Sequence, residues 1–224
     1  MKIVSLVASP RGMRGNTAAL LRLVLEGAEA AGATAETIVL PGNTVLPCKA
    51  CDSCHKKGAC PQKDDFEAIK AKIYESDGLV LASPNYIFSV SAQMKAFMDR
   101  CCGVIHCMSF EGKYGVSVVT SGGGDEQPIA DYMNHFLITT GITPVGSVCA
   151  TMGGVSEPAF ADETKREAIE LGRNLVNAWK TRAAFPEVDR AKGEFKNRMQ
   201  LLMTYRKEQW PYEWEYWRKN RGLT

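Results

Sequence analysis

Four of the eight cysteines in this chain lie within the segment PCKACDSCHKKGAC. They are Cys48, Cys51, Cys54 and Cys60, so their spacing is C-x2-C-x2-C-x5-C. The run C-x2-C-x2-C supplies three ligands of a [4Fe–4S] cluster in bacterial ferredoxins. Zinc sites usually pair two short Cys-Cys units across a longer span, which this segment lacks. The spacing favours an iron–sulfur cluster, while zinc, a redox disulfide and the absence of any metal stay open as alternatives.

The remaining cysteines and the histidines show no comparable pattern. The other four cysteines are expected to be small apolar side chains, buried as free cysteines usually are: Cys101, Cys102, Cys107 and Cys149. His55 lies within the cysteine segment, where we expect a solvated loop histidine, with a metal ligand as the alternative. His106 and His135 form no constellation with other reactive residues, and no Ser/His/Asp arrangement is present.

A second candidate site begins with SPRGMRGNT, from Ser9 to Thr17, between a predicted strand and a predicted helix. A helix N-terminus presents free N–H groups to a phosphate, and Ser9, Arg11, Asn16 and Thr17 can add polar or charged contacts. The segment has neither the dinucleotide fingerprint nor the Lys-Ser/Thr pattern of nucleotide hydrolases. It therefore predicts a mononucleotide phosphate loop, with an ordinary capped turn as the alternative.

Two further segments follow later predicted strands. Pro84, Asn85, Tyr86, Ile87 and Phe88 leave the third strand in an irregular loop whose amides and aromatic rings suit a flat heteroaromatic ligand. Burial of the two aromatic rings in the core is the alternative. The fourth strand ends in a glycine loop that lets the backbone approach a ligand closely; its candidate residues are Ser121, Gly122 and Gly123.

The elements that must position these residues alternate between strands and helices. Buried strands are predicted over 2–9, 33–40, 78–83, 113–121 and 143–151. Helices are predicted over 17–31, 64–75, 91–101, 127–140 and 162–182. This alternation predicts an α/β fold with a doubly wound, five-stranded parallel sheet in the flavodoxin-type order 2-1-3-4-5.

Chain length and composition limit the possible domain organisation, partners and location of the protein. The 224 residues predict one domain over 1–184, which includes the cysteine loop 47–63, and a helical extension over 185–224 with three of the four tryptophans. A helix is predicted over 193–207, and the aromatic tail is expected to pack on the domain or on a neighbouring subunit. The net charge of +2 gives no case for nucleic acid. Without a signal peptide or a membrane span, we expect a cytoplasmic protein whose thiols stay reduced.

Together, SPRGMRGNT, SPNY with the following MKAFMDR, and TSGGG resemble the flavodoxin-like NADPH-dependent FMN reductase family over about residues 1–180. The cysteine segment followed by DDF resembles its iron–sulfur flavoprotein branch. The resemblance implies that the first loop holds the FMN phosphate, the loop after the third strand lies along the flavin ring, and the glycine loop closes over the other side. It also implies a [4Fe–4S] cluster on Cys48, Cys51, Cys54 and Cys60.

The function expected from this resemblance is FMN-dependent oxidoreduction or electron transfer, with the cluster exchanging electrons with FMN. No protein side chain is assigned a catalytic role, because the cofactors carry the reaction. The donor is expected to be NAD(P)H or a ferredoxin, and the assembly a homodimer or homotetramer. The alternatives are a cluster-free NAD(P)H-dependent FMN or quinone reductase, a flavodoxin-type electron carrier, and a zinc-stabilised binding module.

Overall fold

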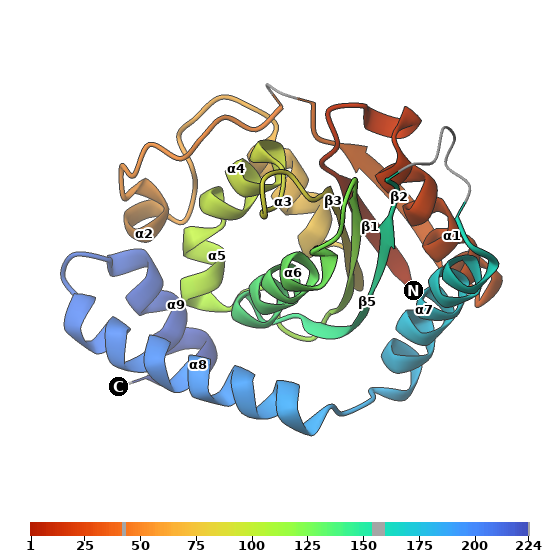
Figure 1. Cartoon of the computed structure of the whole chain (residues 1–224). Coiled ribbons are helices and arrows are strands. Elements are labelled where there is room, and N and C mark those ends of the chain that lie inside the picture. Colours follow the sequence, from red (N-terminus) through yellow and green to blue (C-terminus); the bar gives the residue numbers. More distant parts are fainter. Residues whose placement is uncertain (42–43, 154–159, 224) are drawn as a thin grey trace.

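The computed structural model of the chain describes residues 1–41, 44–153 and 160–223 (Figure 1). Its centre is one sheet of five parallel strands: β1 Lys2–Val7, β2 Thr34–Val39, β3 Gly78–Pro84, β4 Tyr114–Ser121 and β5 Thr143–Thr151. The strand order is β2-β1-β3-β4-β5, as predicted. Every residue of β3 and β4 is buried, because helices cover both faces of the sheet.

The helices begin and end close to the residues predicted from the sequence, with a few exceptions. They are η1 Gly12–Arg14, α1 Asn16–Ala30, α2 Ser53–Lys57, α3 Phe66–Tyr74, α4 Ala92–Arg100, α5 Cys102–Cys107, α6 Glu126–Thr140, α7 Asp162–Thr181, α8 Pro186–Arg206 and α9 Pro211–Arg221. The short helices α2 and α5 were not predicted. The helix predicted over 193–207 begins earlier, at Pro186, because proline is well tolerated in the first turn.

Two hydrophobic cores flank the sheet. On one face, α1 and α7 approach so closely that a Cβ on Gly27 would lie 1.9 Å from the carbonyl oxygen of Ile169. On the other face, α3, α4 and α6 pack their apolar sides around Phe66, Phe97 and Phe136. Figure 1 shows these helices on the two sides of the sheet. The segments that follow β1, β3 and β4 meet at the carboxyl ends of these strands.

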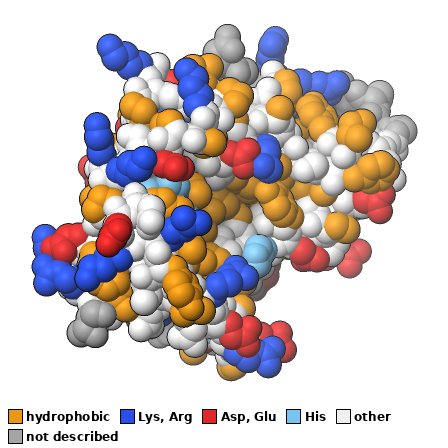
Figure 2. Space-filling view, turned by 90° about the vertical axis from the view of Figure 1, so that its left-hand side faces the viewer, with side chains coloured by type: hydrophobic (Ala, Val, Ile, Leu, Met, Phe, Trp, Pro, Cys, Tyr) orange, Lys and Arg blue, Asp and Glu red, His pale blue; other side chains and the backbone are white. Residues whose placement is uncertain are grey.

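The C-terminal extension packs back onto the domain, which is one of the two placements expected from the sequence. Helices α8 and α9 build a third cluster with Met199, Met203 and Trp217 at its centre, closed against Met108 at the end of α5. Figure 1 shows α9 beside α2 and α5, on the side away from the sheet. Figure 2 shows that side of the molecule, where hydrophobic side chains gather in a recess bordered by lysine and arginine. None of the described helices is long and apolar enough to cross a membrane.

Candidate functional site

A cavity of about 320 Å³ lies where β1, β3 and β4 end. Its size is within the usual range for ligand sites. It is lined by nine residues that the sequence singled out: Ser9, Arg11, Asn16, Thr17, Pro84, Asn85, Tyr86, Ser121 and Gly122. Thr120 and Met152 complete the lining and were not predicted. The cavity thus joins three loops that are far apart in the sequence.

The loop after β1 is folded tightly enough to require glycine at two positions. Gly12 has a φ of +55°, and a Cβ on Gly15 would lie 2.9 Å from the hydroxyl oxygen of Ser9. Gly15 occupies the N-cap of α1, so Asn16 and Thr17 lie in the first helical turn. The N–H groups of that turn have no partners within the helix and are available to an anion.

Asn85 connects the loop after β3 to the glycine loop. Its Nδ2 donates to the carbonyl oxygens of Gly124 at 3.1 Å and Asp125 at 3.3 Å, which fixes the orientation of the amide. Its Oδ1 is then buried without a hydrogen-bond donor among the described residues. Buried acceptors are rarely left unpaired, so this oxygen suits a ligand that offers an N–H group. A flavin ring carries such a group.

Residues Tyr86–Ser89 form a small hairpin beside the cavity. Tyr86 and Ser89 exchange backbone hydrogen bonds of 2.8 and 3.2 Å, and Ile87 and Phe88 both have positive φ at the tip. The tip side chains are 91% and 76% exposed and do not line the cavity. Tyr86 is 46% exposed, so the expected alternative of core burial is wrong for both aromatic rings. Positive φ is costly for a β-branched residue, and such conformations cluster at binding sites.

Ser121 organises the glycine loop after β4. Its hydroxyl oxygen accepts from the N–H groups of Gly123 at 3.2 Å and Gly124 at 2.7 Å, and the hydroxyl donates to Glu126. Thr151 donates to the same carboxylate at 2.6 Å. Burial alone would raise the pKa of Glu126, but these two hydroxyl donors outweigh it and lower the pKa. Gly123 is therefore positioned by Ser121, although it does not line the cavity.

The four cysteines of the cysteine loop line a second cavity of about 320 Å³. The loop wraps around this space because Ala50 and Asp52 adopt left-handed conformations, with φ of 48° and 58°. The N–H of Ala50 donates to Sγ of Cys48 at 3.4 Å, an interaction that stabilises a thiolate. The structure therefore brings Cys48, Cys51, Cys54 and Cys60 together around one space.

A buried ion pair holds the two ends of this loop together. Asp64 accepts from Nη1 of Arg100 at 2.7 Å and from Nη2 at 3.1 Å, and also from the backbone N–H of Leu46 at 2.9 Å. Burial disfavours the carboxylate, but these donors outweigh it and lower the pKa of Asp64. Arg100 and Lys49 also line the cysteine cavity, and Nε of Arg100 is buried without an acceptor. Asp52 and Asp99 line the same cavity, so cations and carboxylates both face it, and Nε of Arg100 stays available to an acceptor.

Beside the cysteine cavity lies a cluster that the sequence did not reveal. His55 is only 6% exposed, so the expectation of a solvated loop histidine is wrong. His106, which was expected to form no constellation, and Cys102, which was expected to be a buried apolar side chain, lie next to it. Fully buried Glu213 accepts from Nδ1 of His55 at 2.6 Å and from Nδ1 of His106 at 3.0 Å. We call His55, Cys102, His106 and Glu213 the His-Cys cluster.

Electrostatics within the His-Cys cluster favour the thiolate. Burial would raise the pKa of Cys102, but hydrogen bonds and charge from His106 and His55 lower it to about 7. Burial would lower the pKa of His106, but Cys102 and Glu213 raise it to about 9. The cluster therefore concentrates negative charge around two imidazole rings.

Comparisons with known proteins agree with this geometry. Residues 1–156 match the family model for NADPH-dependent FMN reductase. An iron–sulfur flavoprotein of Archaeoglobus fulgidus is 37% identical over 183 residues, which is 81% of this chain and 82% of that protein. Iron–sulfur flavoprotein MJ1083 of Methanocaldococcus jannaschii is 35% identical over 182 residues, covering 78% of this chain and 93% of that protein.

Solved structures share the fold at low sequence identity. RosB, crystallised with 8-demethyl-8-formylriboflavin-5′-phosphate, superposes with a TM-score of 0.66 at 14% identity, over 81% of this chain and 79% of RosB. An NADH:FMN oxidoreductase superposes with a TM-score of 0.59 at 19% identity, over 84% of this chain and 92% of that one. The family match and the close relatives show that the chain belongs to the NADPH-dependent FMN reductase family and is a flavin-dependent oxidoreductase.

Proposed function

We propose that the cavity at the strand ends holds FMN and that the cysteine loop holds a [4Fe–4S] cluster. The observation that carries the proposal is the pairing of two preformed cavities in one chain, one with an unpaired acceptor at Asn85 and one lined by four cysteines. The relatives named iron–sulfur flavoproteins support both assignments.

In this proposal the loop after β1 binds the phosphate of FMN. The N–H groups at the start of α1 point toward it, the hydroxyls of Ser9 and Thr17 and the amide of Asn16 donate, and Arg11 adds a positive charge. The tight fold of the loop keeps these donors in place before the ligand arrives, which lowers the entropic cost of binding.

The flavin ring would lie between the other two loops. Pro84, Asn85 and Tyr86 form one wall, with Oδ1 of Asn85 accepting from the ring, and Ile87 and Phe88 extend that wall outside the cavity. A second wall comes from the glycine loop, whose members are Ser121, Gly122 and Gly123. Because Ser121 is itself held by Glu126, this second wall is fixed in the absence of the ring.

The cysteine loop fits a cluster for two independent reasons. Its two left-handed residues direct three thiols spaced by three residues around a common space, and Cys60 closes the ring from the other end of the loop. Arg100 and Lys49 supply the positive charge that offsets a cluster bound by four thiolates.

Bound FMN supplies hydride and single-electron chemistry and a cluster supplies single-electron chemistry, so a chain that holds both can connect NAD(P)H or a ferredoxin to one-electron acceptors. The two cavities share no lining residue. Exposed Ile87 and Phe88 beside the flavin cavity offer an apolar contact between subunits. A homodimer or homotetramer would let the cysteine loop of one subunit approach the flavin cavity of another.

The experiment is anaerobic purification of the full chain, followed by assays of FMN, iron, acid-labile sulfide and zinc. We expect one FMN and about four iron and four sulfide per chain. Cys51→Ser should lose most of the iron but keep the FMN, while Cys149→Ser, which changes a cysteine remote from the loop, should keep both. Full FMN without iron in the wild-type chain would refute the cluster and leave the flavin assignment intact.

A cluster-free NAD(P)H-dependent FMN or quinone reductase is the second candidate. It is favoured by one relative, an NAD(P)H dehydrogenase (quinone) of Cupriavidus metallidurans that is 30% identical over 135 residues, or 59% of this chain and 65% of that protein. Steady-state oxidation of NADPH by a quinone, unchanged in Cys51→Ser, would support this candidate over the first.

A further inference from the structure

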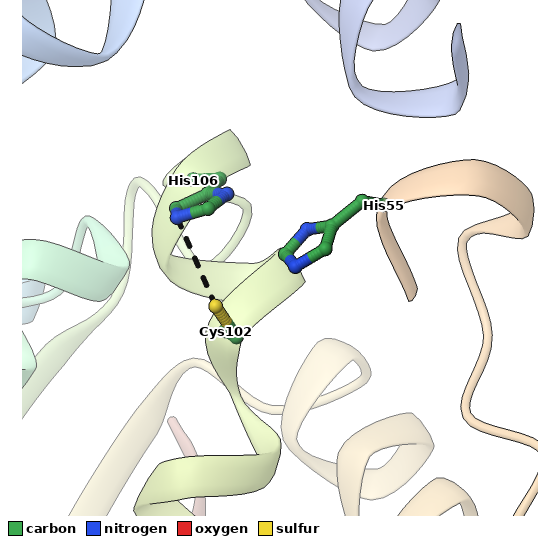
Figure 3. Close-up of side chains that lie close together, drawn as sticks. All are labelled: His55, Cys102 and His106. Carbon is green, nitrogen blue, oxygen red and sulfur yellow. Dashed lines mark hydrogen bonds between the residues drawn. The ribbon is translucent and has the colours of Figure 1, made fainter. Parts of the chain in front are cut away.

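The His-Cys cluster brings together side chains from three separate elements. His55 comes from α2, Cys102 and His106 from α5, and Glu213 from α9. One ligand atom each from His55, Cys102 and His106 lies within 4.8 Å of the other two. Figure 3 shows the two imidazole rings and the thiol converging, with Nε2 of His106 3.8 Å from Sγ of Cys102.

The roles of the ring nitrogens follow from Glu213. A carboxylate only accepts, so both Nδ1 atoms donate to it. If both rings are neutral, the Nε2 atoms of His55 and His106 are both hydrogen-bond acceptors. The thiol of Cys102 has only one proton to donate to these two nitrogens. The other sulfur near His55 belongs to Cys54, which as a cluster ligand would have no proton to give. With neutral rings one Nε2 atom would lack a donor; either protonated rings, with Oδ1 of Asp52 3.9 Å from Nε2 of His55, or a bound cation would resolve this.

A divalent cation would satisfy the whole arrangement. It would accept the lone pairs of both Nε2 atoms and the thiolate of Cys102, and the charges of Cys102 and Glu213 would neutralise it. Glu213 already holds both rings by Nδ1, which is the usual way a carboxylate orients metal-binding histidines. Two imidazoles and one thiolate, borderline to soft ligands, suit zinc better than magnesium or calcium.

We propose that His55, Cys102 and His106 bind a single zinc ion, separate from the cluster in the cysteine loop, with Glu213 orienting both imidazoles. Because His55 and Cys102 also line the cysteine cavity, the zinc ion would lie directly beside the cluster proposed there. Trp210 stacks on both imidazoles, with ring centroids 4.5 and 4.9 Å away, and shields the other side.

This zinc site would give the C-terminal extension a function. Residues 1–156 match the family model, whereas Trp210 and Glu213 lie beyond it. The extension contributes one more fixed contact, from Nε1 of Trp217 to the carbonyl oxygen of His106 at 3.0 Å. The zinc ion would tie the cysteine loop to α5 at the point where the extension covers both.

The test is zinc-edge X-ray absorption on the full chain, purified with FMN and supplied with zinc. The method detects zinc alone, so iron in a cluster does not interfere. We expect two nitrogen ligands at about 2.0–2.1 Å and one sulfur at about 2.3 Å. Four sulfur ligands would place zinc in the cysteine loop, and a shell without sulfur would place it on the surface; either result overturns the proposal.

Variants give a second, independent measurement by equilibrium dialysis with zinc. Cys102→Ser should abolish tight binding, and Glu213→Gln should weaken it by about 10–100-fold, as loss of an orienting carboxylate usually does. Cys149→Ser and His135→Gln change a half-buried cysteine and an exposed histidine elsewhere, and should bind as the wild type does. FMN content reports whether each variant folds. Wild-type zinc affinity in folded Cys102→Ser would overturn the proposal.

Discussion

Replacing Asp64 by asparagine tests whether the buried ion pair with Arg100 holds the cysteine loop. The side chains of Asp64 and Arg100 are 4% and 1% exposed, so the pair is almost completely removed from water. Asparagine keeps the shape of the side chain but loses the charge. It also replaces one acceptor oxygen by an NH₂ group, which would face the donors of Arg100 or the N–H of Leu46.

The expected loss of stability follows from the buried charge that the substitution leaves on Arg100. Arg100 would remain buried with a full charge and without a carboxylate, and breaking a buried pair in this way costs about 3–5 kcal/mol of unfolding free energy. Glu215→Gln is the matched control, because Glu215 pairs with Arg218 at the surface. Exposed pairs contribute at most about 1 kcal/mol, so this control should change stability little.

Urea unfolding at neutral pH and saturating FMN, followed by far-ultraviolet circular dichroism, measures the unfolding free energy of each variant. The slope of unfolding free energy against urea concentration should stay the same in Asp64→Asn, while the urea concentration at the unfolding midpoint falls. A loss below about 1 kcal/mol, equal to that of the control, would refute the argument that this pair anchors the loop.

The pH dependence gives the same reasoning a second measurement. The pKa of Asp64 is lowered in the folded protein, so its stabilising contribution is complete above the unfolded value of about 3.9. It is lost as the pH falls through the folded pKa, because the unfolded state then binds the proton first. The stability gap between wild type and Asp64→Asn should therefore be constant at neutral pH and shrink below about pH 4.

Three further predictions concern the two sites. Gly15→Ala should lower FMN affinity at least about tenfold, since its Cβ would lie 2.9 Å from the hydroxyl of Ser9; quenching of flavin fluorescence measures this. Glu126→Gln should weaken FMN binding at neutral pH, and the wild type should approach the variant as the pH falls through the lowered pKa of Glu126, which flavin titrations across pH would show. Gly58→Ala should release α9 from the cysteine loop, because its Cβ would lie 2.3 Å from the ring of Tyr212; faster proteolysis of the C-terminal extension would report it.

Gly193→Ala is the common control for both glycine variants. Nothing lies within 4 Å of a Cβ built on Gly193, and its conformation is helical. It should leave FMN affinity and proteolysis unchanged or slightly improve stability. Unchanged FMN affinity in Gly15→Ala, or unchanged proteolysis in Gly58→Ala, would contradict the close packing inferred at those positions. A constant FMN affinity ratio between Glu126→Gln and wild type down to acid pH would contradict the role given to Glu126.

The fold and the flavin cavity could largely be predicted because their signals are local. Each buried strand is a short run of apolar residues, and parallel strands bring their carboxyl ends to one edge, so the loops that follow must meet. The cavity residue Thr120 was missed because nothing in the sequence distinguishes the last residues of a buried strand. Its hydroxyl lies 2.7 Å from that of Thr17, across 103 residues of chain.

The His-Cys cluster could not be predicted, because its defining contact has no local signal. Glu213 is one of two acidic residues in an aromatic helix, and its bond to His55 joins positions 158 residues apart. His55 was judged by its polar neighbours in the loop, whereas its burial comes from α9. A signal did exist at Cys102 and His106, since residues four apart share one face of a helix. The short helix α5, which places Cys102 and His106 on one face, was not predicted.

The position of α9 at the end of the chain also sets an order of events during synthesis. Glu213 is made 158 residues after His55. The nascent sheet and its cysteine loop can therefore be in place while Trp210 and Glu213 are still missing, since domains form from the N-terminus as the chain emerges. During that interval His55 and His106 lack the carboxylate that accepts from their Nδ1 atoms, and the arrival of α9 supplies it. The burial of His55 is therefore a late event for the nascent chain, completed only when α9 packs against α2.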